Sequence, residues 1–218
     1  MTLPEFGEKG FKIRGGRNIL LEDPEPIDYR AEEATLLTGV NSGGKTTTLD
    51  LVAQVYVLAH MGFPVPAEEA VVEPVDRIYY YCPSKNTMNS GAFEGALRKF
   101  ENVLELDGSK LVLADELENI TEPGASARII SGIIEILKEQ GGTAVFVSHL
   151  AEKIRREANC QIQVDGIEAE GLDGDMNLIV DRTPKKDLLA TSTPELVVKK
   201  LASRRNSELY DKLVEKFG

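Results

Sequence analysis

A glycine-rich loop between two apolar segments is the feature that most constrains how this chain can fold. The run Ala-Thr-Leu-Leu-Thr at 34–38 leads into Gly-Val-Asn-Ser-Gly-Gly-Lys-Thr at 39–46. This loop fits the phosphate-binding pattern G-x-x-x-x-G-K-[ST], which requires a strand before it and a helix after it. Apolar residues at helical spacing over 45–61 supply the helix. The sequence therefore predicts an α/β protein with this loop at the carboxyl end of a strand.

The loop is expected to bind the phosphates of ATP. Its glycines let backbone N–H groups turn toward an anion, and the N-terminus of the following helix adds a favourable dipole. Lys45 is expected to reach the β- and γ-phosphates and to act in catalysis, and the Thr46 hydroxyl to bind Mg²⁺. The predicted nucleotide-binding residues of the loop are Gly39, Val40, Asn41, Ser42, Gly43, Gly44, Lys45, Thr46 and Thr47. A glycine-rich turn with a solvated lysine is the alternative without function.

Two more apolar runs end in residues that suit this chemistry. The run at 110–114 is followed by Asp115 and Glu116, which behind a phosphate-binding loop form a Walker B element. We expect Asp115 to bind Mg²⁺ and Glu116 to polarise the attacking water. The run at 143–147 leads to His149, which would lie at the same edge of the sheet. A neutral imidazole there could contact the γ-phosphate or the water, so His149 is a predicted catalytic residue.

Strands alternating with helices predict βαβ units and a mostly parallel central sheet flanked by helices. The further expected elements are a strand at 77–81 and helices at 93–106 and 126–137. The first 30 residues are expected to form short irregular strands rather than a separate domain. His60, on the helix after the loop, is interpreted as structural.

The alternation of apolar strands and helices ends at about residue 159. The segments 161–164 and 176–180 are expected to pair as a hairpin across a loop rich in Gly and Asp. Two short helices are expected at 194–203 and 207–217.

The charge of the chain argues against DNA binding by this chain alone. The net charge is −11, whereas binding to phosphate backbones requires clustered Lys and Arg. Residues 182–218 nevertheless hold nine Lys and Arg against five Asp and Glu. We interpret this basic tail as a solvated helical face, with contact to an acidic partner surface as the alternative.

The remaining composition favours a reduced, cytoplasmic protein without a membrane segment. Cys82 and Cys160 have no paired spacing and are expected to be free thiols. The longest apolar stretch is too short and too polar to span a membrane, and no signal peptide is recognised at the N-terminus.

Taken together, these motifs resemble the ATPase domain of the MutS family, the dimeric DNA mismatch-repair proteins of the ABC-type ATPase class. The segment 38–46 is similar to the family pattern T-G-P-N-x-G-G-K-[ST], with Val40 in place of proline. The segments 63–67 and 74–78 resemble V-P-A…P-I-D-R-I. The pairs 115–116 and 148–149 resemble the D-E and T-H pairs of the family. The resemblance runs from about residue 16 to 180, and more loosely to the C-terminus.

The resemblance implies a homodimer with composite ATP sites. Asn-Ser-Gly-Ala-Phe at 89–93 is similar to the S-T-F element of MutS proteins, so Ser90 is expected to reach the partner's nucleotide in trans. An ordinary helix cap is the structural alternative for Ser90. The insertion between the loop and this element is too short for an ABC transporter. By analogy, the segment 21–29 is the expected location of the residue that stacks on adenine.

Two departures from the family pattern limit how far the properties of the family can be assigned to this chain. The stretch after the Walker B element is usually G-R-G-T-S, whereas here residues 117–124 read Leu-Glu-Asn-Ile-Thr-Glu-Pro-Gly. The mismatch-recognition, connector, lever and clamp domains of the repair proteins have no counterpart in these 218 residues.

The sequence thus predicts an ABC-type P-loop NTPase domain over residues 1–180, with a C-terminal hairpin. The resemblance implies that residues 181–218 form a small helical dimerisation appendage. Its expected function is Mg²⁺-dependent ATP hydrolysis in a MutS-like homodimer, linked to DNA mismatch repair or related DNA transactions. DNA would be contacted only through further domains or partners. An ATPase subunit of a transport or assembly complex, or a nucleotide-gated interaction module, are the alternatives.

Overall fold

A five-stranded parallel sheet forms the centre of the molecule. The computed structural model describes residues 1–40, 43–83, 90–120, 122–173, 178–190, 198, 200–203 and 207–217. The strand order is β6-β7-β8-β4-β9, and all four neighbouring pairs are parallel. Its strands are β4 (Ala34–Gly39), β6 (Arg77–Tyr81), β7 (Lys110–Asp115), β8 (Thr143–Val147) and β9 (Gln163–Ile167). The mixed α/β fold with a mostly parallel, helix-flanked sheet is therefore confirmed.

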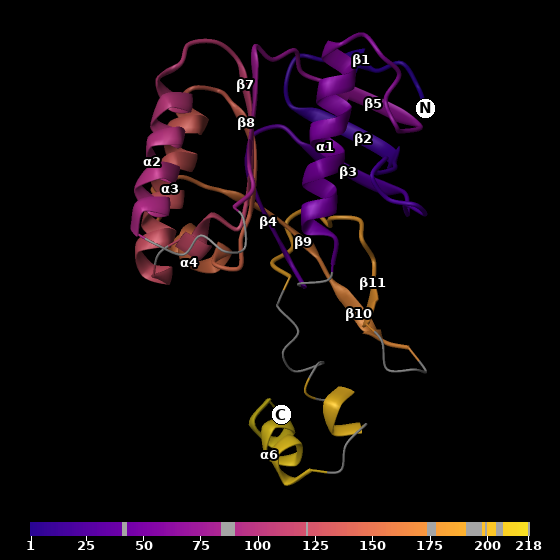
Figure 1. The fold of residues 1–218 in the computed structure, drawn as a ribbon, viewed down its shortest axis with the longest axis vertical. Helices are drawn as coiled ribbons and strands as arrows, with labels where there is room; N and C mark the ends of the chain where they lie inside the picture. Colours follow the sequence, from indigo (N-terminus) through magenta and orange to yellow (C-terminus); the bar gives the residue numbers. More distant parts are fainter. Residues whose placement is uncertain are drawn as a thin grey trace.

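Helices cover both faces of this sheet, as Figure 1 shows. The helix α1 (Lys45–His60) lies on one face, and α2 (Ser90–Glu105), α3 (Pro123–Glu139) and α4 (Ala151–Glu157) lie on the other. A short 3₁₀ helix, η1 (Leu117–Ile120), follows β7. The expected helices at 45–61, 93–106 and 126–137 are thus confirmed, whereas α4 was not anticipated.

The uninterrupted apolar runs of the central strands follow from this double coverage. In β8, Val145 and Val147 belong to the core on the α1 side, whereas Ala144 and Phe146 belong to the core under α2 and α3. Because successive side chains of a strand point to opposite faces, a strand covered on both faces needs apolar residues at every position.

A second sheet covers the outer side of α1. Its order is β1-β5-β2-β3, in which β2 pairs antiparallel with both of its neighbours. The strands are β1 (Glu5–Phe6), β2 (Phe11–Gly16), β3 (Ile27–Ala31) and β5 (Glu69–Val72). The first 30 residues therefore contain short strands, and β2 and β3 share a core with α1 rather than forming a separate unit.

The expected pairing of the hairpin is wrong, although a hairpin exists. It joins β10 (Ala169–Leu172) to β11 (Leu178–Val180). The segment 163–167 instead forms β9, which pairs in parallel with β4 at the edge of the central sheet. The physical reason is that β9 buries Val164 and Ile167 against the two cores, which a solvent-exposed hairpin could not do.

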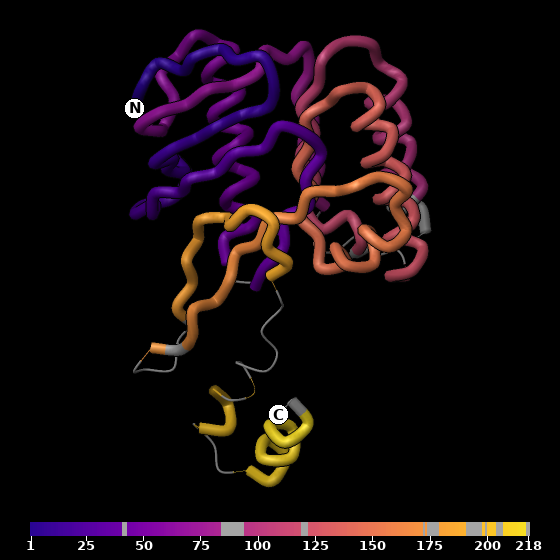
Figure 2. The backbone as a smooth tube through the Cα atoms, turned by 180° about the vertical axis from the view of Figure 1, so that it is seen from behind, coloured from indigo at the N-terminus to yellow at the C-terminus, as the bar shows by residue number. Residues whose placement is uncertain are grey.

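The end of the chain lies apart from the two sheets, as the two opposite views in Figures 1 and 2 show. The helix α6 (Glu208–Phe217) confirms the expectation for 207–217. Residues 200–203 are helical, whereas most of the expected helix at 194–203 lies outside the described residues. Before this point, Lys185 pairs with Gly166 of β9, so the start of the predicted appendage is attached to the sheet.

Replacing Phe146 with alanine tests the core beneath α2 and α3. Phe146 is 1% exposed and stacks on Phe100 with ring centroids 6.2 Å apart. Loss of the ring is expected to lower the free energy of unfolding by about 3–5 kcal/mol in urea titrations followed by circular dichroism. The control Ile136→Ala, at a position 41% exposed, should change it by about 0.5 kcal/mol or less. Equal losses in the two variants would contradict this packing.

Candidate nucleotide-binding site

The parallel register brings the predicted site residues to one edge of the central sheet. Leu37 and Asp115 are both register partners of Val147. The residues that follow these positions therefore emerge side by side, at the carboxyl ends of β4, β7 and β8. This is the edge at which open α/β sheets bind ligands.

Glycines on either side of the phosphate loop have backbone conformations that other residues rarely adopt. Gly39 has φ 140°, and a Cβ atom at this residue would lie 2.3 Å from the carbonyl oxygen of Ile167. Gly44, with φ 88°, is the N-cap of α1. Gly43 N–H donates to the Val40 carbonyl at 2.9 Å and closes part of the turn. Asn41 and Ser42 lie outside the described residues.

Lys45 is held inside this loop rather than extended into solvent. It is 5% exposed, and its Nζ donates to the carbonyl oxygens of Gly39 and Val40, each at 3.0 Å. Burial lowers the pKa of Lys45, and the nearby carboxylates of Glu116 and Asp115 oppose this shift. The cation is thus positioned where the loop would meet phosphate oxygens.

Thr46 and Asp115 join the loop to β7. The Thr46 hydroxyl donates to Asp115 Oδ2 at 2.7 Å. Asp115 Oδ1 is buried and has no hydrogen-bond partner in the described part of the chain. Burial raises the pKa of Asp115, and the hydrogen bond from Thr46 opposes this shift. Thr47, next along α1, is half-buried, and its carbonyl accepts from Asn18 Nδ2 at 3.2 Å.

This donor set fits a Mg²⁺ ion. The cation prefers oxygen ligands, takes few of them from protein and completes its shell with water and phosphate. A hydroxyl and a carboxylate in contact, one of whose oxygens has no partner, offer such a partial shell. Among the described residues no group of three or more His, Cys, Asp or Glu could hold a metal by itself.

Glu116 and His149 form the second part of the site. His149 Nε2 lies 3.1 Å from Glu116 Oε1, and both side chains are about one-third exposed. Glu116 has φ 44°, in the left-handed region that is unusual for a non-glycine residue. Strained backbone of this kind clusters at functional sites. The structure thus brings together Lys45, Thr46, Asp115, Glu116 and His149, as the sequence predicted.

A cavity of about 230 Å³ opens beside His149. Its lining residues include Gly39, Ser148, His149 and Leu189. Ala190, in the segment after Lys185, also lines the cavity. Ala190 N–H donates to Thr38 Oγ1 at 3.1 Å, which attaches this segment to β4.

The described residues do not place two predicted nucleotide contacts, Ser90 and the adenine-stacking residue, at this site. Ser90 begins α2, and its side chain lies outside the described residues. Within the segment 21–29 that was expected to hold the adenine-stacking residue, Tyr29 is 5% exposed and packs against Phe11 in the core. Tyr29 is therefore not available for stacking.

Arg182 is a residue that sequence reasoning missed. Its aliphatic stem lies about 4 Å from the point that a Cβ on Gly44 would occupy, and its Nε pairs with Glu25 Oε2 at 2.9 Å. This ion pair connects the β2–β3 loop to the segment after β11, next to the N-terminus of α1. Because Arg182 and Gly44 are far apart in the sequence, no local pattern indicates that they lie close together.

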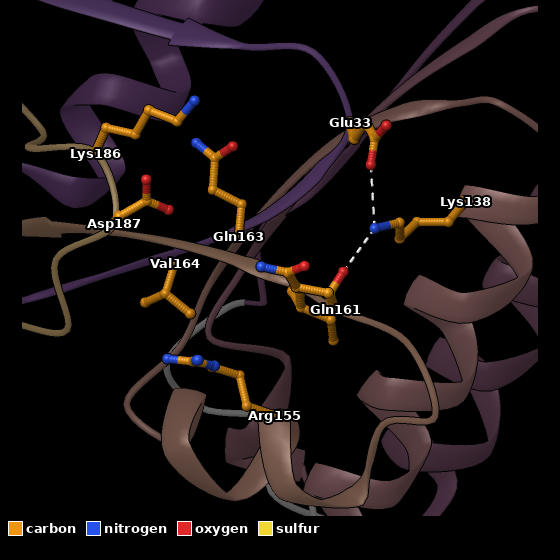
Figure 3. A pocket seen from close by; sticks show the side chains of 9 residues that line it. Glu33, Lys138, Arg155, Gln161, Gln163, Val164, Lys186 and Asp187 are labelled. Atoms are coloured by element: carbon orange, nitrogen blue, oxygen red, sulfur yellow. Dashed lines mark hydrogen bonds and ion pairs between the residues drawn. The ribbon is translucent and has the colours of Figure 1, made fainter.

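A larger cavity, of about 400 Å³, lies toward the amino-terminal ends of the central strands. There Lys138 Nζ pairs with Glu33 Oε2 at 3.1 Å and donates to the Gln161 carbonyl at 2.6 Å (Figure 3). It lies at the amino ends of β4 and β9, away from the phosphate loop, and we do not assign it to the candidate site.

The fold and the site define an α/β protein whose mostly parallel sheet presents a glycine-rich loop, two acidic residues and a histidine at its carboxyl edge. The sequence pattern of MutS domain V matches residues 35–202. The chain therefore belongs to the MutS family, which confirms the resemblance noted from its motifs.

A relative in Pyrococcus furiosus, "DNA-binding protein MutS2", is 43% identical over 231 residues. The match covers 99% of this chain and 41% of the relative, so the chain spans about two-fifths of the relative's length. No helix in the described part of the chain is long and apolar enough to cross a membrane.

Proposed function

We propose that this chain is a Mg²⁺-dependent ATPase unit of the MutS type, with a P-loop fold of the ABC-ATPase class. The observation that carries the proposal is the contact between Thr46 and Asp115, beside the buried Lys45. In that arrangement a glycine-rich loop, a metal-binding hydroxyl and a metal-binding carboxylate meet at one point. The unpartnered Asp115 Oδ1 supports a cation there.

The protein residues divide the work of phosphoryl transfer. Lys45 and the backbone N–H groups of the loop bind the phosphates, while Thr46 and Asp115 hold Mg²⁺, which supplies charge neutralisation when bound. Glu116 accepts the proton of the attacking water, and His149, 3.1 Å from Glu116, orients that carboxylate or the water.

The active species in this proposal is a homodimer with composite sites. Ser90, at the start of α2, reaches the partner's nucleotide, and residues after 180 form the dimerisation appendage. ATP binding tightens the dimer, and hydrolysis loosens it. Family membership and the name of the Pyrococcus relative support a role in DNA mismatch repair or a related DNA transaction. With a net charge of −11, the chain would reach DNA through further domains or partners.

Asp115→Asn separates the proposed metal role from folding. We expect Mg²⁺-ATP turnover to fall by at least about 100-fold, because the amide removes a charged metal ligand while keeping its size. Burial raises the pKa of Asp115, so above the ordinary carboxyl pKa the ionised side chain is less favourable in the folded chain than in the unfolded chain and lowers stability. At neutral pH the variant should therefore be at least as stable as the wild type.

The matched control is Asp107→Asn, at an exposed position in the loop before β7. Its turnover should equal that of the wild type over a Mg²⁺ titration. A wild-type chain without Mg²⁺-ATP turnover would contradict the enzyme proposal and favour a nucleotide-gated interaction module.

A further inference from the structure

A buried carboxylate lies directly behind the turn that carries His149. Glu118, in η1, is 8% exposed. Its Oε1 accepts hydrogen bonds from Ser148 Oγ at 2.9 Å and from the His149 backbone N–H at 2.6 Å. One carboxylate oxygen thus holds two successive residues at the end of β8.

The same turn is fixed by two neighbouring hydrogen bonds. Ser148 Oγ accepts from Leu150 N–H at 2.9 Å, and Glu116 N–H donates to the Val147 carbonyl at 3.1 Å. The chain from Glu116 to Glu118 and the turn after β8 therefore form a closed network. The contact between the His149 ring and the Glu116 carboxylate lies on its solvent side.

This network keeps a carboxylate in an unfavourable environment. Glu118 Oε2 is buried without a hydrogen-bond partner in the described part of the chain. Burial raises the pKa of Glu118, and the hydrogen bonds from the 148–149 turn oppose that shift. A buried, half-satisfied carboxylate is weak evidence of a stabilising role. Such groups are instead frequent next to functional sites.

Glu118 also stands where the chain departs from its family pattern. It belongs to the stretch 117–124, which replaces the usual G-R-G-T-S. The resemblance therefore assigns it no role.

We propose that Glu118 is a positioning residue, which fixes the 148–150 turn and thereby holds the His149 ring against Glu116. Its effect on catalysis rests on the proposed ATPase function, whereas its effect on the His149 ring does not. Glu118 itself touches neither nucleotide nor water in this role.

The two histidines of the chain allow the positioning to be measured without any turnover. His60 is held between the Tyr56 carbonyl and the Val75 N–H, at 2.8 and 2.9 Å, and serves as an internal reference. In NMR spectra of ¹⁵N-histidine-labelled protein at one fixed pH, Glu118→Ala is expected to shift or broaden the His149 ring signals and leave those of His60 unchanged. Unchanged His149 signals would overturn the proposal.

Two further substitutions distinguish a loss of positioning from a general folding defect. Glu118→Gln keeps an acceptor oxygen in place and should preserve the His149 signals. Glu118→Asp withdraws the oxygens by one methylene while keeping the charge, and should shift them as alanine does. The control Glu122→Ala removes an exposed carboxylate four residues later and should change neither histidine.

The kinetic arm tests whether this positioning matters for hydrolysis. Glu118→Ala should lower kcat by about 10- to 100-fold, the usual range for residues that orient a functional side chain, with KM for ATP nearly unchanged. In a His149→Ala background the same substitution should have little further effect. Independent, multiplicative losses would overturn the proposal. A wild type without turnover would contradict the ATPase function alone, and the NMR arm would still decide the role of Glu118.

Discussion

Replacing Lys45 with alanine is expected to lower kcat/KM for Mg²⁺-ATP by at least about 10³-fold, which corresponds to about 4 kcal/mol of transition-state stabilisation. Lys45 Nζ lies inside the loop on the carbonyl oxygens of Gly39 and Val40. Without the charge of Lys45, Mg²⁺ alone would offset the repulsion between the bound phosphates and the carboxylates of Asp115 and Glu116. Nucleotide affinity should fall together with turnover, as measured by titration with a fluorescent ATP analogue.

The folded state should tolerate this substitution. Burial lowers the pKa of Lys45, so the charged side chain is less favourable in the folded chain than in the unfolded chain and adds no net stability at neutral pH. Unfolding in urea should therefore occur near the wild-type midpoint. The matched control is Lys12→Ala, on the exposed face of β2, which should keep full affinity and turnover. Retention of ATP binding by Lys45→Ala would contradict the assignment of the loop.

The sequence predicted best those strands whose local apolar pattern matches their burial in the central sheet. The strands 34–38, 110–114 and 143–147 could be predicted because both faces of the sheet are covered, which makes their apolar runs continuous. Once these strands are parallel, their carboxyl ends meet at one edge. The meeting of Thr46, Asp115 and His149 was therefore predictable from three short motifs.

Pairing partners were less predictable than elements. The sequence prediction ended a hairpin strand at 164 and placed the following Gly- and Asp-rich residues in its loop, whereas Asp165 and Gly166 lie inside β9. Its true partner, β4, precedes it by more than 120 residues, and no local pattern encodes that register. The strand β5 has only four residues, and α4 only seven, so neither shows enough periods of its pattern.

The supporting residues of the site could not be found from motifs. Glu118 contacts Ser148, 30 residues further along the chain. Arg182 lies beside Gly44, although all five strands of the central sheet have ended before Arg182 in the sequence. Both are charged residues in segments that looked like ordinary loop or solvated tail. Their roles depend on burial and distance, which only the folded chain supplies.

Glu116→Gln is expected to lower kcat by at least about 100-fold while leaving ATP binding intact, within the range of 10²–10⁴ for loss of a general base. The amide keeps the size of Glu116 and its contact with the His149 ring, 3.1 Å away in the wild type, but it accepts no proton from water. Lys45, Thr46 and Asp115 remain to hold the nucleotide. KM or Kd for Mg²⁺-ATP should accordingly stay within a few-fold of the wild type. The control Glu122→Gln alters an exposed carboxylate before α3 and should turn over normally.

The same variant tests whether ATP controls the dimer. A ligand that binds the dimer more tightly than the monomer shifts the equilibrium by mass action, and a variant that binds ATP without hydrolysing it keeps that shift. Glu116→Gln should therefore elute from a sizing column as a dimer with Mg²⁺-ATP, and at a smaller size with ADP or without nucleotide. Adding Lys45→Ala should remove the ATP-dependent change, because the loop no longer binds phosphate. Hydrolysis at the wild-type rate would exclude Glu116 as the base. An elution volume independent of ATP would refute nucleotide-controlled dimerisation while leaving the assignment of the base intact.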